Sequence, residues 1–247
     1  PRQVAEFWLR HLPFYQTFTA ERAAYRNFVN GMWPPDSALH RNPYREWIGA
    51  QIRADAFGYA CPGGPEDAAG LAWKDATISH VKNGIYGEMW VAAMLAAAFV
   101  SDDPKKVVDL GLSEVPCNCR LSEAIRRVQS WREERCSAAE ATGRILDEYG
   151  AYSGVHTINN AAIVAMALLW GERDFSRTVG LAVRAGLDTD CNGATAGSVA
   201  GAMVGADGIP GHWFEPLNDS VATAVAGEAG LTISGLAERT RRMQEQA

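Results

Sequence analysis

The sequence has 247 residues, a net charge of −6 and 47% apolar residues, which is enough for one compact domain with a real core. Its Lys and Arg residues are scattered without a basic stripe, a pattern that excludes the usual footprint of a nucleic-acid-binding protein. The longest apolar run, residues 90–100, is too short to span a bilayer. We therefore expect neither a nucleic acid nor a membrane as a partner.

The cysteines indicate a reducing compartment. Their number, five, is odd and their spacing is irregular. Cys117 and Cys119 are one residue too close for a Cys-x₂-Cys zinc half-site. Because no signal peptide is visible either, we predict reduced thiols and a cytoplasmic protein. The chain begins at Pro1, so a targeting segment upstream stays open.

Apolar residues recur at helical spacing along nearly the whole chain, and no alternating runs bounded by hairpin turns are evident. The predicted helices span residues 2–11, 20–30, 44–58, 65–78, 85–100, 104–113, 120–133, 137–149, 155–170, 173–185, 191–205 and 232–246. Pro65 suits a first helical position, and Pro210 is expected to close the helix before it. We find no internal repeat or linker and predict a single all-α domain over residues 1–247.

One predicted helix differs from the rest. Residues 90–99 are apolar nearly all round, so we expect this segment to be the central, buried helix. Many of its residues are alanines, which favours tight packing against neighbouring helices. The eight tryptophans are spread over most helices, and we expect them to pack in the core or to form the walls of a cleft.

The most informative stretch is residues 185–201. Asp188 and Asp190 lie at the predicted turn into a helix, where their outer oxygens suit a hard cation such as Mg²⁺. The alternative is that one of them is an N-cap and the other a surface carboxylate. Glycines then recur every four residues, and we expect their helical face to allow close approach of a neighbouring backbone. These glycines are Gly193, Gly197, Gly201 and Gly205.

This stretch resembles the late signature of the ADP-ribosylglycohydrolase family (dinitrogenase-reductase-activating-glycohydrolase type), a Gly-x-Asp-Thr-Asp-Thr-Asn-Ala sequence before a Gly/Ala-rich helix. Residues 42–53, 75–80, 84–89 and 156–160 are also similar to members of that family. The resemblance implies a compact orthogonal helical bundle. It also implies that Asp188 and Asp190 bind one or both ions of a Mg²⁺ pair, for which Mn²⁺ can substitute. Cys191 stands where the family usually has a Thr ligand, although a thiol is a poor ligand for Mg²⁺.

The family also has an early Thr/Ser-Asp-Asp-Thr motif that supplies the remaining metal ligands, and no such motif is found in this chain. Ser101, Asp102 and Asp103 come nearest to it. Because Pro104 follows, an N-cap with proline at the first helical position explains them better. We therefore expect the chain to lack the N-terminal part of the family: either a missing segment of the same protein supplies it, or the protein lacks half of the metal site.

Four further residues are candidates for substrate binding. The resemblance places His80 where the family has a His that lines the substrate cleft. Asn192 either orients ligands and substrate or helps to cap its helix. His156 and Asn159 are three residues apart, so they share a helical face that could point at the Asp188 turn, unless they act as caps.

Two arginines and one glutamate leave alternatives open. Arg45 and Arg53 could clamp a pyrophosphate, or they could form ion pairs with Glu46 or Asp55. Glu88 is either solvated on a helix surface or part of the cleft lining.

The resemblance implies a Mg²⁺-dependent hydrolase that cleaves the N- or O-glycosidic bond of an ADP-ribosyl group on a protein or small-molecule acceptor. In that chemistry the ion fixes and polarises the ribose hydroxyls and makes a bound water more acidic, and Asp188 or Asp190 can take the proton of that water. A second hypothesis is a glycosidase that acts on a small N-riboside metabolite. A third is a non-catalytic relative, similar to the crystallin-like members of the family.

Overall fold

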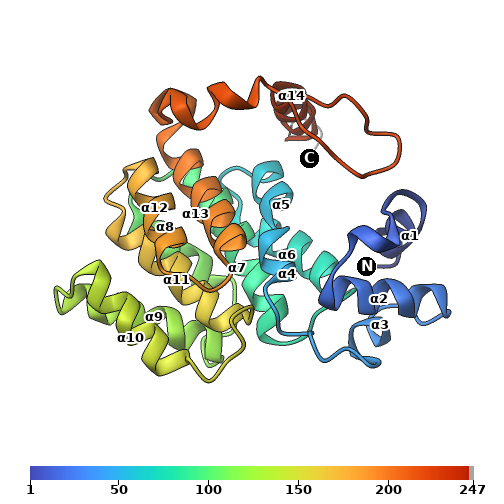
Figure 1. Ribbon diagram of the computed structural model, residues 1–247, viewed down its shortest axis with the longest axis horizontal. Coiled ribbons are helices and arrows are strands. Elements are labelled where there is room, and N and C mark those ends of the chain that lie inside the picture. Colours follow the sequence, from blue (N-terminus) through green and yellow to red (C-terminus); the bar gives the residue numbers. More distant parts are fainter. Residues whose placement is uncertain (245–247) are drawn as a thin grey trace.

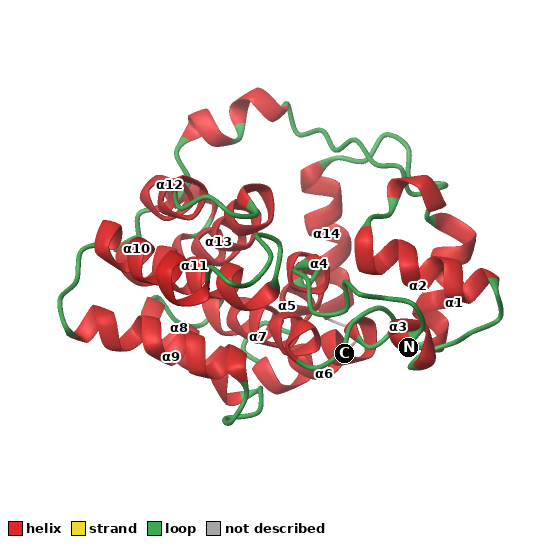
Figure 2. Ribbon diagram, turned by 60° about the horizontal axis from the view of Figure 1, so that its bottom comes forward, coloured by secondary structure: helices red, strands yellow, loops and turns green. Residues whose placement is uncertain are grey.

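The computed structural model describes residues 1–244, and within them every regular element is a helix (Figure 2). The all-α prediction is therefore confirmed. The only β-type pairings in this range are two isolated bridges, Trp47 with His156 and Val221 with Leu231. None of the helices in the described part combines the length and apolar character that a bilayer crossing requires.

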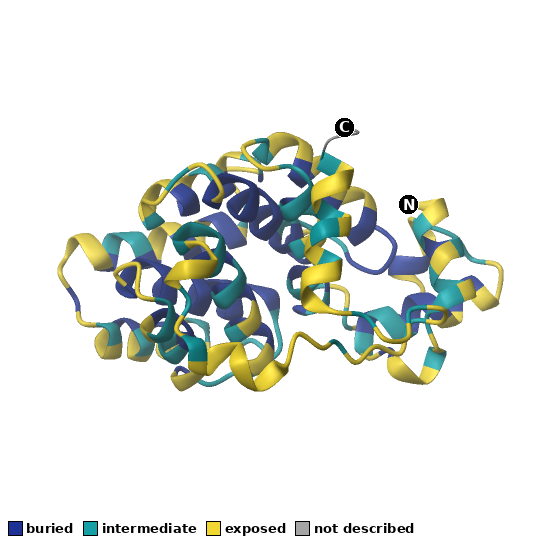
Figure 3. Ribbon diagram, turned by 90° about the horizontal axis from the view of Figure 1, so that it is seen from above, coloured by how far each residue is buried: buried dark blue, intermediate teal, exposed yellow. Residues whose placement is uncertain are grey.

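Two buried helices form the centre. α7 (Asn83–Ala98) and α11 (Thr157–Trp170) are almost wholly covered by their neighbours, which follows from their alanine-rich, nearly uniform apolar sequences. Figure 3 shows buried helical segments in the interior and exposed segments around the outside. The expectation of a central helix at residues 90–99 is thus confirmed. Close packing depends on small residues, since a Cβ added to Gly111 would lie 2.6 Å from the Met94 side chain.

The remaining long helices surround this pair. α6 packs on α7, α9 on α11, and α12 on α13, while α8 contacts α7 (Figure 1). Two of these helices begin where the sequence predicts. Pro65 begins α6, and Asp103 caps α8 by accepting hydrogen bonds from two backbone N–H groups. The bounds are α6 (Pro65–Ala76), α8 (Pro104–Ser113), α9 (Arg120–Glu133), α10 (Ala138–Tyr149), α12 (Phe175–Arg184) and α13 (Thr189–Val204).

The N-terminal helices form a separate lobe on one side of the molecule (Figure 1). The lobe comprises α1 (Arg2–His11), α2 (Thr19–Val29) and α3 (Asp36–Leu39). α1 and α2 share a small apolar cluster in which Tyr25 and Phe28 are buried, and Ile78, after α6, completes it. This cluster is distinct from the main core around α7 and α11.

The predicted helix over residues 44–58 is wrong. The chain instead makes turns up to Ile48 and then two short helices, α4 (Gly49–Ile52) and α5 (Asp55–Ala60). The reason is tertiary, because the backbone around Trp47 pairs with the loop before α11, where the Ile48 N–H donates to the Val155 carbonyl at 3.0 Å. The helical spacing of apolar residues carries no information about such a long-range pairing.

The C-terminal segment leaves the bundle after α13. Gly205, with a φ of +72°, ends that helix five residues before Pro210, which was expected to close it. Short 3₁₀ turns then lead over the top of the helices toward α1, where the Ala226 N–H donates to the His11 carbonyl at 2.8 Å (Figure 1). α14 (Ile233–Gln244) follows and packs on α5. Residues 245–246 of the predicted last helix lie outside the described residues.

Candidate active site

The turn between α12 and α13 presents two carboxylates at one place. Gly186 and Leu187 both adopt a positive φ, and the chain then enters α13 at Asp188. Such a conformation is common for Gly but costly for Leu, so the tight turn is a strained feature beside the candidate site. Asp188 occupies the N-cap position of α13 without a side-chain capping hydrogen bond, and Asp190 is exposed, so the N-cap alternative and the role in metal binding both stay predictions.

Asp188, Asp190 and Cys191 offer one ligand atom each within 4.8 Å of one another. Burial raises the pKa of the Asp188 carboxyl, and the neighbouring Asp190 raises it further. Burial also raises the pKa of the Cys191 thiol well above its ordinary value, which keeps the sulfur protonated. Two carboxylates suit Mg²⁺, whereas a neutral thiol does not. The residues therefore fit a single divalent ion, and no second group of this kind is found among the described residues.

Asn160 positions this turn. Its side-chain carbonyl accepts from the Asp188 N–H at 3.1 Å and from the Asn192 side-chain amide at 2.8 Å. Its own amide donates to the carbonyls of Gly154 and His156 at 3.0 and 2.8 Å. Sequence reasoning included Asn160 in a similar segment but gave it no role at the site. The signal available in the sequence was an Asn at the start of an apolar helix, and the structure shows that this side chain is fully buried and hydrogen-bonded.

A cavity of about 480 Å³ opens beside the two aspartates. It lies between the N-terminal lobe and the Asp188 turn, and its walls are formed by α1, the start of α2, residues 47–53, Val155 and the first residues of α13. Three aromatic side chains line it: Trp8, Phe18 and Trp47. A volume of this size is typical of small-molecule sites.

The four predicted substrate-binding residues do not line this cavity. His156 is the N-cap of α11, and its Nδ1 accepts from the Ile158 N–H at 3.2 Å. Asn159 donates to the Ser153 carbonyl at 3.0 Å. Asn192 is fully buried and donates to Asn160, with its carbonyl oxygen left without a hydrogen-bond partner. The roles assigned to these side chains stay predictions, and the contacts described here favour positioning over direct contact with a ligand.

His80 is buried behind the cavity wall, with 1% of its surface exposed. Its Nδ1 lies 2.8 Å from the Ser79 hydroxyl, while its Nε2 has no hydrogen-bond partner and lies 4.0 Å from Glu21. Burial lowers the pKa of this imidazole well below its ordinary value, and the positive charge of Arg53 lowers it further. His80 is thus neutral, and contact with a substrate stays a prediction.

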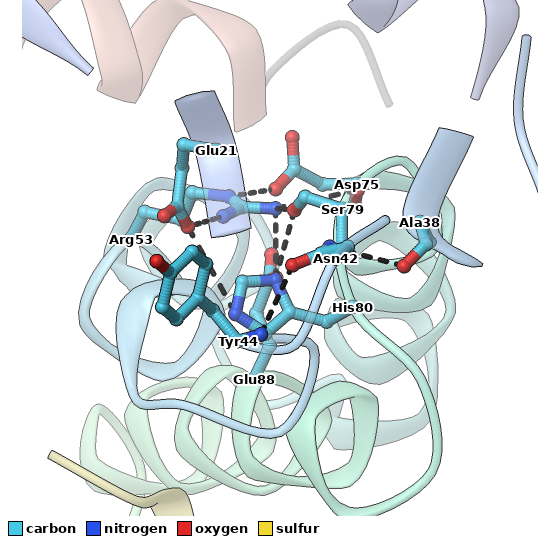
Figure 4. Close-up of polar contacts among 9 residues, drawn as sticks. All are labelled: Glu21, Ala38, Asn42, Tyr44, Arg53, Asp75, Ser79, His80 and Glu88. Carbon is cyan, nitrogen blue, oxygen red and sulfur yellow. Dashed lines mark hydrogen bonds and ion pairs between the residues drawn. The ribbon is translucent and has the colours of Figure 1, made fainter. Parts of the chain in front are cut away.

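Arg53 joins a buried ionic cluster and is not free to clamp a pyrophosphate (Figure 4). Its Nη1 donates to Glu21 at 2.6 Å, its Nε donates to Asp75, and its Nη2 donates to the Ser79 hydroxyl at 2.8 Å. Glu88 lies 3.8 Å from the same guanidinium and is fully buried, contrary to the solvated alternative. Burial raises the pKa of Glu88 well above its ordinary value, and the negative charge of Asp75 adds to this.

The other arginine is also engaged. Arg45 donates to the Asn42 carbonyl at 3.0 Å, whereas Glu46 pairs with Arg120 at 2.7 Å. Neither of the ion pairs considered from sequence, with Glu46 or Asp55, is formed. Glu21 was not singled out from the sequence at all, because a single Glu in the first turn of an amphipathic helix carries no local signal of a site.

The model of the family described as ADP-ribosylglycohydrolase matches residues 1–246. No curated protein matches this sequence. The family match agrees with the all-α architecture and with an acidic group that could hold the metal on which the family generally depends. Membership implies hydrolysis of a glycosidic bond, with ADP-ribosylated molecules as the class of substrate. Because the match covers essentially the whole chain, the protein belongs to the ADP-ribosylglycohydrolase family.

Proposed function

We propose that the protein is a Mg²⁺-dependent hydrolase that cleaves the bond between the anomeric carbon of a ribose and a nitrogen or oxygen acceptor. The observation that carries this proposal is the pair Asp188 and Asp190, whose ligand atoms lie together at the wall of a cavity large enough for a riboside. When bound, Mg²⁺ would supply Lewis acidity toward ribose hydroxyls and water. Mn²⁺ would serve the same donor set.

The protein residues would hold and orient the reactants. Asp188 and Asp190 hold the ion, and the Asn160 side chain fixes the turn that carries them. Water forms the new bond to the anomeric carbon as the glycosidic bond breaks, and its proton passes through one of the two carboxylates toward solvent. The departing acceptor takes up a proton, so the net reaction consumes one water. The aromatic side chains of Trp8 and Trp47 provide an apolar surface for the group attached to the ribose.

Two substrate classes are candidates. Family membership favours an ADP-ribosyl group on a protein or a small molecule. A small N-riboside is the second candidate, and the charges around the cavity favour it, because Arg53 is already paired with two carboxylates. A non-catalytic role is the outcome that the experiment below would reveal.

The test compares Mg²⁺ binding and hydrolysis in the wild type and in Asp190→Asn. We expect calorimetry to detect Mg²⁺ binding by the wild type and a loss of about 100-fold or more in the variant, because outer-shell changes alone cost 10–100-fold. Release of ribose or ADP-ribose should require Mg²⁺ and be lost in the variant.

Asp103→Asn is the matched control. Asp103 also stands at a helix start, but its carboxylate caps α8 and lines neither the metal group nor its cavity. This control should bind Mg²⁺ as the wild type does. Equal Mg²⁺ binding by wild type and Asp190→Asn would refute the assignment, and metal binding without any glycosidic hydrolysis would establish the non-catalytic alternative.

A further inference from the structure

One wall of the cavity has the groups of an anion site. The first turn of α2 reaches the cavity at Phe18 and Thr19, and the guanidinium of Arg53 lies beside it. A helix start and an arginine are the two features that proteins most often use to bind phosphate. At this wall the arginine already serves a carboxylate of the protein itself, which lies in the first turn of the same helix.

That carboxylate is Glu21, in the first turn of α2. Arg53 donates to it at 2.6 Å (Figure 4). Burial raises the pKa of the Glu21 carboxyl, and the positive charge of Arg53 opposes this shift. The side chain lines the cavity with only 16% of its surface exposed. A carboxylate thus stands among the groups that a phosphate would need.

The position of Glu21 is fixed from several sides. Gly49 makes room for it, because a Cβ at that residue would come within 2.7 Å of the Glu21 Oε2 atom. Arg53, which holds Glu21, is in turn held by Asp75 and by the hydroxyl of Ser79 at 2.8 Å. A ligand phosphate could not displace Glu21 without breaking an ion pair that is four-fifths buried.

The charges along the cavity lead to the same conclusion. The described residues that line it include three carboxylates, of Glu21, Asp188 and Asp190, and one cation, Arg53. A single divalent ion on the two aspartates would balance their charge, and Glu21 balances Arg53. A pyrophosphate would then bring two further negative charges close to Glu21, where no unpaired cation of the lining residues could compensate them.

We propose that Glu21 is a specificity residue that occupies the anion-binding groups of the cavity, so that the protein selects a ribosyl substrate without phosphate groups. The substrate class is an N-riboside that carries an aromatic base, which Trp8 and Trp47 can contact. This inference rests on the proposed function for the placement of the ribose at Asp188 and Asp190.

The experiment uses two ligands that differ by one phosphate. Formycin A is a nucleoside whose C–C glycosidic bond resists hydrolysis, and formycin A 5′-monophosphate adds the phosphate. Calorimetry in Mg²⁺ should show that the wild type binds the nucleoside at least about tenfold more tightly than the monophosphate. Glu21→Gln should tighten the monophosphate by about tenfold and change the nucleoside by less than about threefold.

Glu88→Gln is the matched control. Glu88 lies in the same cluster, 3.8 Å from Arg53, but does not line the cavity, so both affinities should stay within about twofold of the wild type. Glu21→Asp keeps the charge and should retain the preference of the wild type. Glu21→Ala provides a second neutral variant if Glu21→Gln does not fold.

The inference is overturned if the wild type binds the monophosphate as tightly as the nucleoside or fails to bind the nucleoside. It is also overturned if neither neutral variant shifts the ratio of the two affinities. Hydrolysis is measured separately, so the two proposals can fail independently. A protein with the predicted ratio but no hydrolysis would refute only the proposed function, and hydrolysis without that ratio would refute only the role of Glu21.

Discussion

Replacing Asp55 with Asn is expected to stabilise the protein above pH 6 and to leave its stability unchanged near pH 3. Asp55 begins α5 and accepts a hydrogen bond from the Ser198 hydroxyl, to which Tyr59 donates at 2.9 Å. Its second oxygen, Oδ1, is buried without a partner. Burial raises the pKa of this carboxyl to about 6.

The sign of the effect follows from linkage. Between the ordinary pKa of 3.8 and about 6, the folded protein binds a proton at Asp55 that the unfolded chain does not bind, so the stability of the wild type falls as pH rises through this window. Above pH 6 the folded state holds a poorly solvated charge. The difference between the two pKa values corresponds to ~3 kcal/mol. Asn keeps the hydrogen bond with Ser198 and carries no charge.

Urea denaturation of wild type and Asp55→Asn at pH 3, 5 and 7.5 measures this difference. The variant should gain ~1–3 kcal/mol at pH 7.5, part of that at pH 5 and none at pH 3. Subtracting the free energies of unfolding of the two proteins cancels the contributions of all other titrating groups. A variant that is less stable at pH 7.5, or a difference that does not vary with pH, would refute the burial argument.

Three other substitutions test single features. If the thiol stands in the place of a hydroxyl ligand, Cys191→Thr should tighten Mg²⁺ binding or raise activity, because hard cations prefer oxygen. No change in either quantity would show that this position does not face the ion. Gly197→Leu should lower the free energy of unfolding by ~1–3 kcal/mol, because the glycine lies against Val179. Gly197→Ala places a Cβ at an ordinary 3.4 Å from the Val179 side chain and should not destabilise the protein. Equal melting temperatures for the wild type and both variants would contradict this packing. Ser137→Ala removes a capping box with Glu140 and should cost α10 ~1 kcal/mol in thermal unfolding, with a cost near zero counting against the cap.

The helices could be predicted wherever the spacing of the apolar residues and the capping residues indicated the same bounds. The segment at 104–113 illustrates this, since Asp103 and Pro104 mark its start and its apolar residues repeat with helical spacing. The segment at 44–58 was not predictable, because its turns are set by pairing of Trp47 with His156, more than a hundred residues away. The expected close approach of a backbone to the glycine face of α13 is wrong, because Gly193 and Gly197 meet the side chains of Val183 and Val179 on α12.

The residues of the candidate site also differ in whether the sequence alone identifies them. Asp188 and Asp190 are separated by one residue, so a local motif was enough to identify them. Glu21 and Trp8 reach the cavity only because the N-terminal lobe folds against the Asp188 turn. The ionic cluster brings together residues 21, 53, 75 and 88, of which only Arg53 and Glu88 were considered from the sequence, each by itself. No local sequence pattern shows that these four residues lie together. Charged side chains that are buried in one cluster can be recognised only in the folded structure.

The two apolar clusters have a consequence for exchange of backbone amide hydrogens. The cavity lies at the seam between them, with Trp8 and Leu12 from the N-terminal cluster on one side and the Asp188 turn on the other. Local unfolding of the lobe breaks the helical hydrogen bonds of α1 and α2 and exposes their amides without unfolding α7 or α11. A ligand that touches both sides must leave before that unfolding occurs, so it slows exchange in α1 and α2 by the factor 1 + [L]/Kd while the slowest amides of the centre report global unfolding. Occupancy of the cavity can thus be read from helices that carry no metal ligand.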